Sequence, residues 1–168
     1  MAKYLEQSGG ALVERAAPTT SAGAASAGLL PALDASGRLD TSFMPTGIGA
    51  DTATITASEA LAAGDFVNIY NNAGAAAVRK ADGAVSGRPA HGFVIAAVAS
   101  GAAATVYFEG TNGAVTGQTP GPVYLSDVAA GRTITTPPTG AGKVVQNLGV
   151  ATSATSINVE PHNHIVLA

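Results

Sequence analysis

Few residues in this sequence could do chemistry, and the most suggestive are two histidines near its C-terminal end. His162 and His164 are two positions apart, so in a strand both imidazoles would face the same side and could share a metal ion. Only Glu160 and the distant His91 could add a ligand, although a three-fold oligomer could gather three copies of the pair on its axis. We expect a polar turn after Pro161 without a metal, and a structural place for His91 at the start of a strand.

The other catalytic patterns are incomplete. Residues 140–143 (Gly-Ala-Gly-Lys) are similar to the end of a phosphate-binding loop, but Pro137 replaces its first glycine and Val144 the residue that would bind magnesium. The chain has no Gly-x-Ser-x-Gly elbow, no cysteine, and no Trp to form a sugar platform beside its carboxylates. We therefore expect no catalytic residue, no cofactor and no resident metal, and a protein that is not an enzyme.

The composition excludes several partner classes. Of 168 residues, 46% are hydrophobic but only 5% aromatic and 11% charged, with 8 basic against 11 acidic residues. Without a Lys/Arg cluster, nucleic acid is not an expected partner. The longest apolar stretch, 93–98, is far below the roughly 20 residues that span a membrane, and the start lacks a secretory signal pattern. We expect no membrane partner and synthesis in a cytoplasm.

From Asp51 onward the chain shows short β-prone runs between Gly, Asn, Asp and Pro. One segment, 57–64, is predicted to form a helical turn capped by Ser58, and Asn112-Gly113 is predicted to be a hairpin turn. The pattern predicts an all-β fold, with a small β-barrel or sandwich body over residues 51–168. The predicted strands are 52–57, 66–70, 76–80, 92–98, 105–109, 123–126, 133–136, 143–151, 156–160 and 165–167.

A weak internal repeat predicts that the body consists of two related hairpin halves. Each half has a strand, a turn, a second strand, a glycine with an apolar strand, and a final strand. This order runs through 64–70, 77–79, 92–96 and 105–108, and again through 121–126, 133–135, 149–151 and 156–159.

Residues 1–50 have a different texture, rich in Gly, Pro, Ser and Thr, and no apolar period of 2 or 3.6 persists there. Ordering a backbone residue costs about 1–2 kcal/mol, which a few scattered bulky side chains do not offset. We expect an extended N-terminal arm that lies along the surface of a partner. The predicted contact residues are Tyr4, Leu5, Leu12, Val13, Leu29, Leu30, Leu33, Leu39, Phe43, Met44 and Ile48.

Several stretches of the chain resemble the head decoration, or cement, proteins of tailed bacteriophages. One is Ser-Ala-Gly-Ala-Ala-Ser-Ala-Gly-Leu-Leu-Pro-Ala-Leu-Asp-Ala-Ser-Gly-Arg-Leu-Asp at 21–40. The others are 44–49, 57–68, 92–101, 117–126, 135–138 and 144–151. These stretches are typical of phage particle proteins generally, including tail fibres and spikes.

The resemblance implies a β-rich homotrimer on the capsid exterior that clamps neighbouring subunits of the phage major capsid protein. It also implies that the arm, residues 1–50, binds the capsid or a neighbouring subunit. The residues favour the same reading, because a core of small side chains buries little area and favours an oligomer. Low charge also suits a protein–protein interface. The alternative is a tail fibre or spike module, whose loops 111–119 and 127–132 would bind a receptor on the host.

Overall fold

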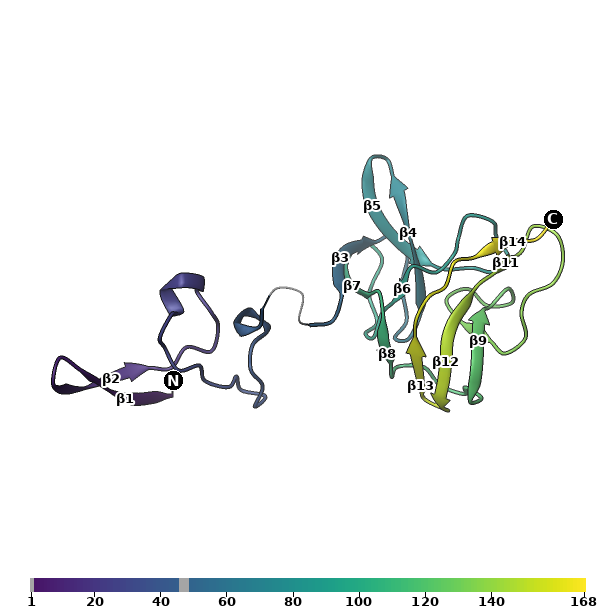
Figure 1. Cartoon of the computed structure of the whole chain (residues 1–168). Coiled ribbons are helices and arrows are strands. Elements are labelled where there is room, and N and C mark those ends of the chain that lie inside the picture. The colour runs from purple at the N-terminus through teal and green to yellow at the C-terminus, as the bar shows by residue number, and fades with distance from the viewer. Residues whose placement is uncertain (1, 46–48) are drawn as a thin grey trace. The chain divides into compact units, whose positions relative to one another are not determined.

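The computed structural model describes residues 2–45 and 49–168 of the chain (Figure 1). The chain divides into two units, 1–49 and 50–168. Strands are the main regular structure of both units, and the described residues contain only two short 3-10 helices. The all-β class that the sequence predicts is therefore confirmed. No helix among the described residues has the length and apolar character needed to cross a membrane.

The N-terminal unit begins with a hairpin that the sequence prediction missed. β1 (Lys3–Ser8) pairs antiparallel with β2 (Ala11–Ala16). Gly9 and Gly10 form the turn, with φ of 59° and 84°. Positive φ at both central residues is the type I′ geometry, which glycine adopts without steric cost. The expected absence of strand periodicity is thus wrong for residues 3–16, where the Gly-Gly pair is itself a hairpin signal.

Loops with local hydrogen bonds make up the rest of this unit. Its two 3-10 helices are η1 (Gly23–Ser26) and η2 (Thr41–Phe43). The Asp40 carboxylate accepts a hydrogen bond from the Ser42 amide at 2.9 Å, which caps η2. Among the described residues of the unit only Ala17 is buried. Side-chain contacts to the backbone, and not a hydrophobic core, shape this part of the chain.

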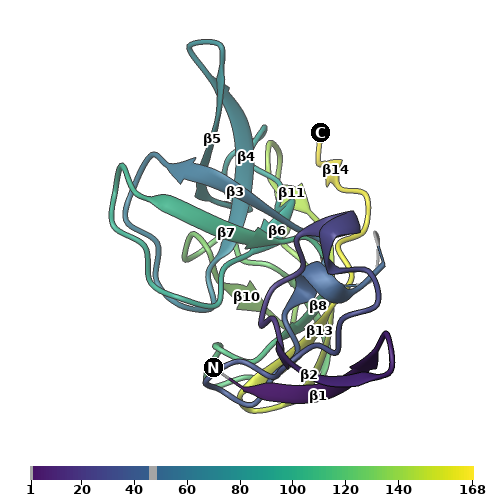
Figure 2. The same cartoon turned by 90° about the vertical axis from the view of Figure 1, so that its left-hand side faces the viewer.

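The first half of the body is a closed barrel in the strand order β3-β5-β4-β6-β7. β3 closes it, because β3 pairs antiparallel with β7 and parallel with β5. Figure 2 shows β3 beside β7, and in both views the β4–β5 hairpin extends beyond the barrel. The strands are β3 (Thr52–Ala57), β4 (Phe66–Asn72), β5 (Ala75–Lys80), β6 (Gly92–Phe93) and β7 (Ala103–Tyr107).

The second half is an antiparallel sheet in the order β10-β9-β12-β13-β8. A separate two-stranded pair, β11 (Val144–Val145) with β14 (Ile165–Val166), attaches the C-terminal end of the chain to the body. The strands of the sheet are β8 (Gly110–Asn112), β9 (Gly121–Leu125), β10 (Thr133–Ile134), β12 (Asn147–Ser153) and β13 (Ser156–Val159).

The two halves repeat one design, as the sequence predicts. The strands β3, β4, β5, β6 and β7 correspond in order to β8, β9, β10, β12 and β13. All four antiparallel pairings of the first half, β3–β7, β4–β5, β4–β6 and β6–β7, recur between the corresponding strands of the second. The parallel β3–β5 pairing, which closes the barrel, has no counterpart among the described residues of the second half.

The pairing register repeats as well. Gly92 lies opposite Val67 in the first half, and Gly149 lies opposite Val123 in the second. A Cβ atom at Gly92 would lie 2.4 Å from a backbone oxygen of β7, and one at Gly149 would lie 2.1 Å from a backbone oxygen of β13. Each half therefore needs glycine at the same place, where two strands approach closely.

Two hydrophobic clusters stabilise the body. The smaller one fills the barrel and includes Val67, while the larger one includes Phe66 and joins the two halves. Successive side chains of a strand point to opposite faces, so β4 is buried on both sides. The Phe66 and Phe93 rings lie 6.2 Å apart, and Phe93 stacks on Tyr107 at 5.5 Å. All three rings come from barrel strands, and they join the second half through the larger cluster, which also includes Leu148 and Ile157.

The helical turn predicted over residues 57–64 is absent, and this prediction is wrong. The Ser58 hydroxyl donates to the carbonyl of Val78 at 3.2 Å instead of capping a helix. Leu61 forms a β-bridge with Val98 and is buried in the barrel. Contacts with distant strands thus override a weak local preference.

Three predicted β features differ in detail. The segment 143–151 splits into β11 and β12 at Gln146, whose side-chain amide bonds both backbone groups of Ala90. The strand predicted over 92–98 is regular only at β6. Asn112 does not form a hairpin turn, because it is buried at the end of β8 and donates to the carbonyl of Gly64 at 3.1 Å.

Candidate binding surfaces

The β1–β2 hairpin exposes apolar side chains on both of its faces. Leu5 and Leu12 lie on one face, 68% and 73% exposed. Tyr4 and Val13 lie on the other face, where the Tyr4 hydroxyl accepts a hydrogen bond from the Leu30 amide at 3.3 Å. Two-stranded hairpins are marginal on their own in water, so an outside surface that covers these leucines would stabilise this one.

Most of the other predicted contact residues are also accessible. Leu30, Leu33, Leu39 and Met44 are exposed, while Leu29 and Phe43 are half-buried. Ile48 lies outside the described residues. The structure brings Leu5 close to Leu12 across the hairpin and Tyr4 close to Leu30, and it does not gather the whole set into one patch.

One ion pair lies on each face of the hairpin. Lys3 contacts Glu14, and the Arg15 Nε donates to Glu6 at 2.7 Å. All four side chains are well exposed to solvent, so each pair contributes at most about 1 kcal/mol. Their main consequence is that the two positive and the two negative side chains cancel, so these four residues give the hairpin no net charge.

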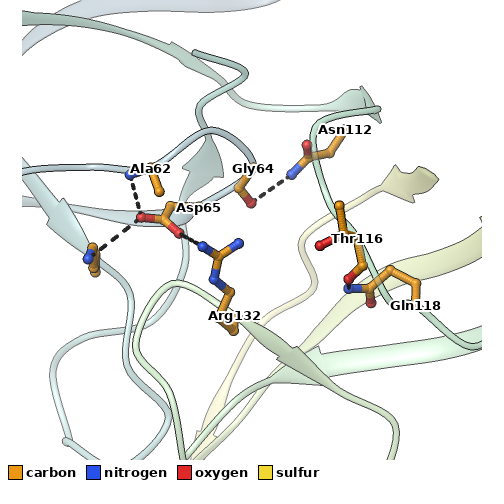
Figure 3. A network of polar contacts seen from close by, with 8 residues as sticks. Ala62, Gly64, Asp65, Asn112, Thr116, Gln118 and Arg132 are labelled. Carbon is orange, nitrogen blue, oxygen red and sulfur yellow. Dashed lines mark hydrogen bonds and ion pairs between the residues drawn. The ribbon is translucent and has the colours of Figure 1, made fainter. Parts of the chain in front are cut away.

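A buried carboxylate ties the two halves of the body together (Figure 3). The Asp65 side chain is only 1% exposed and accepts a hydrogen bond from the Ala62 amide at 2.8 Å. It also faces two cations, with Arg132 Nη2 at 3.3 Å and Lys80 Nζ at 3.9 Å. Arg132 comes from the second half, and a buried carboxylate needs such partners. This network is an anchor between the halves.

Two glycines make this junction possible. Gly64 has φ of +84°, and a Cβ there would lie 2.5 Å from the Ala114 carbonyl oxygen. Gly131 has φ of +77°, and a Cβ there would lie 3.0 Å from the Asp65 carboxyl. The Gly131 carbonyl also accepts a hydrogen bond from the Phe66 amide at 2.9 Å. Backbone of the second half thus packs directly against the turn before β4.

An open seam lies in the second half where the barrel closes in the first. In the first half Ala57 pairs with Val78 between β3 and β5. The repeat register makes Thr116 and Thr133 the corresponding residues. Instead of pairing, they line a cavity of about 170 Å³. The cavity continues as a groove along residues 117–119 and 133–136, and we call the cavity and the groove together the seam.

The seam is polar and only lightly bridged. Its continuation is a groove of about 460 Å³ lined by glycine, Gln118, Ile134 and several threonines. The Thr133 hydroxyl donates to Gln118 Oε1 at 2.8 Å across the seam. No aromatic ring lines the groove, so a sugar would lack a stacking surface. Residues of the predicted receptor loop 111–119 form one wall of the seam. The other predicted loop, 127–132, contributes Arg132 to the lining of the cavity.

The histidines do not assemble into a metal site. Among the residues that the structure describes, no group of three His, Cys, Asp or Glu side chains could hold a metal ion. His91 Nδ1 accepts a hydrogen bond from the Ile69 amide at 3.0 Å. Burial, and then the charge of His164, lower the pKa of His91. The carbonyl of His162 accepts from Gln146, which holds the C-terminal segment against the body.

Comparison with protein-family models, with curated proteins and with solved structures finds no match to this chain. The function must therefore be argued from its own surfaces. The seam was missed at the sequence level, although the internal repeat was its signal, because periodicity does not show whether two corresponding strands meet.

Proposed function

We propose that this protein is a structural component of a phage particle, a capsid decoration protein that binds the outside of the head. The observation that carries the proposal is the N-terminal unit, which exposes apolar side chains on a hairpin and has almost no core. Exposed apolar side chains of this kind mark a site where another protein binds, and binding there would stabilise the N-terminal unit. The resemblance of the sequence to phage particle proteins supports the same conclusion.

The proposed mechanism is binding without a reaction. The N-terminal unit contacts the major capsid protein, and the body forms a homotrimer that projects outward. Each copy makes a modest contact, and linking copies raises the local concentration for the next contact. Neighbouring capsid subunits bridged in this way separate less easily under the pressure of packaged DNA.

A truncation tests the proposal. The body has its own closed barrel and core within residues 50–168, so a protein lacking residues 2–45 should keep its circular dichroism spectrum. It should lose cosedimentation with capsids that lack the natural protein. Capsid binding equal to that of the full chain would overturn the proposed role of the N-terminal unit.

A pair of matched variants sharpens the test. Leu5→Ser with Leu12→Ser removes both apolar side chains from one hairpin face, and Gln7→Ser with Ala11→Ser changes the same strands without removing large apolar groups. Covering a leucine of this exposure is worth about 1–2 kcal/mol, so the leucine variant should bind capsids at least about tenfold more weakly. The control should bind normally.

The second candidate is a tail fibre or spike module. The groove favours it, because one predicted receptor loop, 111–119, forms a wall of that groove. Fluorescent wild-type protein separates the two functions. Binding to host cells, without binding to capsids that lack the natural protein, would favour the receptor role. Binding to such capsids alone would favour the decoration role.

A further inference from the structure

The seam marks the second half as an incomplete copy of the first. In the first half two backbone strands meet and close the barrel. In the second half the corresponding segments are joined by a side-chain contact from Thr133 to Gln118, beside a groove of about 460 Å³. β10 pairs only with β9, so its other edge has no strand partner in the part of the chain that the structure describes.

An extended polypeptide is the ligand that such a seam fits. A strand that enters beside β10 would pair its backbone with the outer edge of β10, which is the β-augmentation mode of recognition. Threonine and glycine line the groove, so main-chain atoms can approach, and the first half shows that this position of the repeat accepts strand pairing. The absence of aromatic lining disfavours a sugar.

The same chain supplies a strand of suitable kind. β2 is exposed along all six of its residues and pairs only with β1. Its outer edge therefore has no strand partner among the described residues, whereas on the β1 side Tyr4 is half-buried and bonds the Leu30 amide. Unpaired edges of this kind are templates for pairing with another chain.

We propose that β2 of one copy inserts into the seam of a second copy. Each copy then has one donor strand and one acceptor seam, on different surfaces. Contacts of this head-to-tail type form a closed ring when the rotation between copies closes. The closed case, a ring of copies whose bodies are joined by β2 strands, is the one that we propose. The inference rests on the oligomer that the proposed function includes, but it does not depend on a capsid.

Crosslinking tests the contact directly, because the chain has no cysteine. Full-length Val13→Cys protein, isotope-labelled, is mixed with full-length Thr135→Cys protein and treated with a short thiol-to-thiol crosslinker. Mixed pairs identified by mass spectrometry should exceed several-fold those formed with Asn72→Cys, an exposed control at the end of β4, in the hairpin that extends beyond the barrel. Equal yields for both partners would overturn the proposal.

Sedimentation gives a second, independent readout. Wild-type protein and Asn72→Trp, which places a ring on the exposed end of β4, should sediment as oligomers. Thr119→Trp, which places the same ring in the groove, should sediment as monomers with an unchanged circular dichroism spectrum. A monomeric wild type, or an oligomeric Thr119→Trp, would contradict the inference. Crosslinking of Thr135→Cys only on capsids would also contradict it, since the occupant would then be another protein.

These outcomes are separable from those of the proposed function. Monomeric protein that still binds capsids would remove the strand exchange and leave the decoration role. A ring that forms through the seam but does not bind capsids would do the reverse.

Discussion

The contact between Gly64 and the second half of the body gives a sharp prediction about stability. Gly64 and Gly101 have nearly the same backbone φ, +84° and +82°. A Cβ at Gly64 would lie 2.5 Å from the Ala114 carbonyl oxygen, while one at Gly101 would meet no atom within 4 Å. Changing each glycine to alanine therefore puts an L-residue at the same unfavourable φ, and only Gly64→Ala adds a collision.

The magnitudes follow from these two terms. Left-handed backbone costs an L-residue about 1–2 kcal/mol, partly offset by about 0.4–1 kcal/mol from a less flexible unfolded chain. Gly101→Ala should thus lower the free energy of unfolding by about 1 kcal/mol or less. Gly64→Ala must also displace backbone, and overpacking of this kind costs about 1–3 kcal/mol more.

Urea and thermal unfolding, followed by circular dichroism, measure the difference. At about 4 °C per kcal/mol for a domain of this size, Gly64→Ala should melt about 4–12 °C below Gly101→Ala. The urea m-value should be the same for both variants, because the surface exposed on unfolding does not change. Equal melting temperatures would refute the close packing of the two halves at Gly64.

Two further predictions concern the first half. Ala73, at the tip of the β4–β5 hairpin, has φ of 51°, so Ala73→Asn should raise the free energy of unfolding by about 1 kcal/mol in urea titrations. Asn at neighbouring Ala75, inside β5, should give no gain, and a gain there or none at Ala73 would refute the strain. The pKa of His91 is lowered by burial and by His164, so the folded state favours the neutral ring. Its contribution is complete above the unfolded pKa of about 6.5 and is lost as the pH falls through the folded pKa. Wild type should therefore lose more stability than His91→Gln between neutral and mildly acidic pH, with His162→Gln as control, and parallel pH profiles for wild type and His91→Gln would contradict this assignment.

The sequence was sufficient to predict the repeat, because turn residues and β-branched runs mark local structure. The strand 52–57 and the corresponding glycines Gly92 and Gly149 are found where the pattern placed them. Local signals failed where distant groups decide. Asn112 resembles a hairpin turn residue but is buried against Gly64, and Gln146 interrupts a strand to bond Ala90.

The N-terminal contact residues could be proposed from the sequence but not arranged. Their alternation is visible only once Gly9-Gly10 is taken as a type I′ turn, which places Leu5 and Leu12 on one face. The internal repeat identifies the two segments of the seam, but the sequence could not show that they stay apart, because whether corresponding strands pair depends on packing and not on residue type.

A cryo-electron microscopy map of the purified phage particle tests the central proposal most directly. A decoration protein should give density of this body on the outer surface of the head, repeated at every equivalent position of the capsid lattice, with the N-terminal unit against the major capsid protein. Density confined to the tail, or a head without it, would contradict the proposed function.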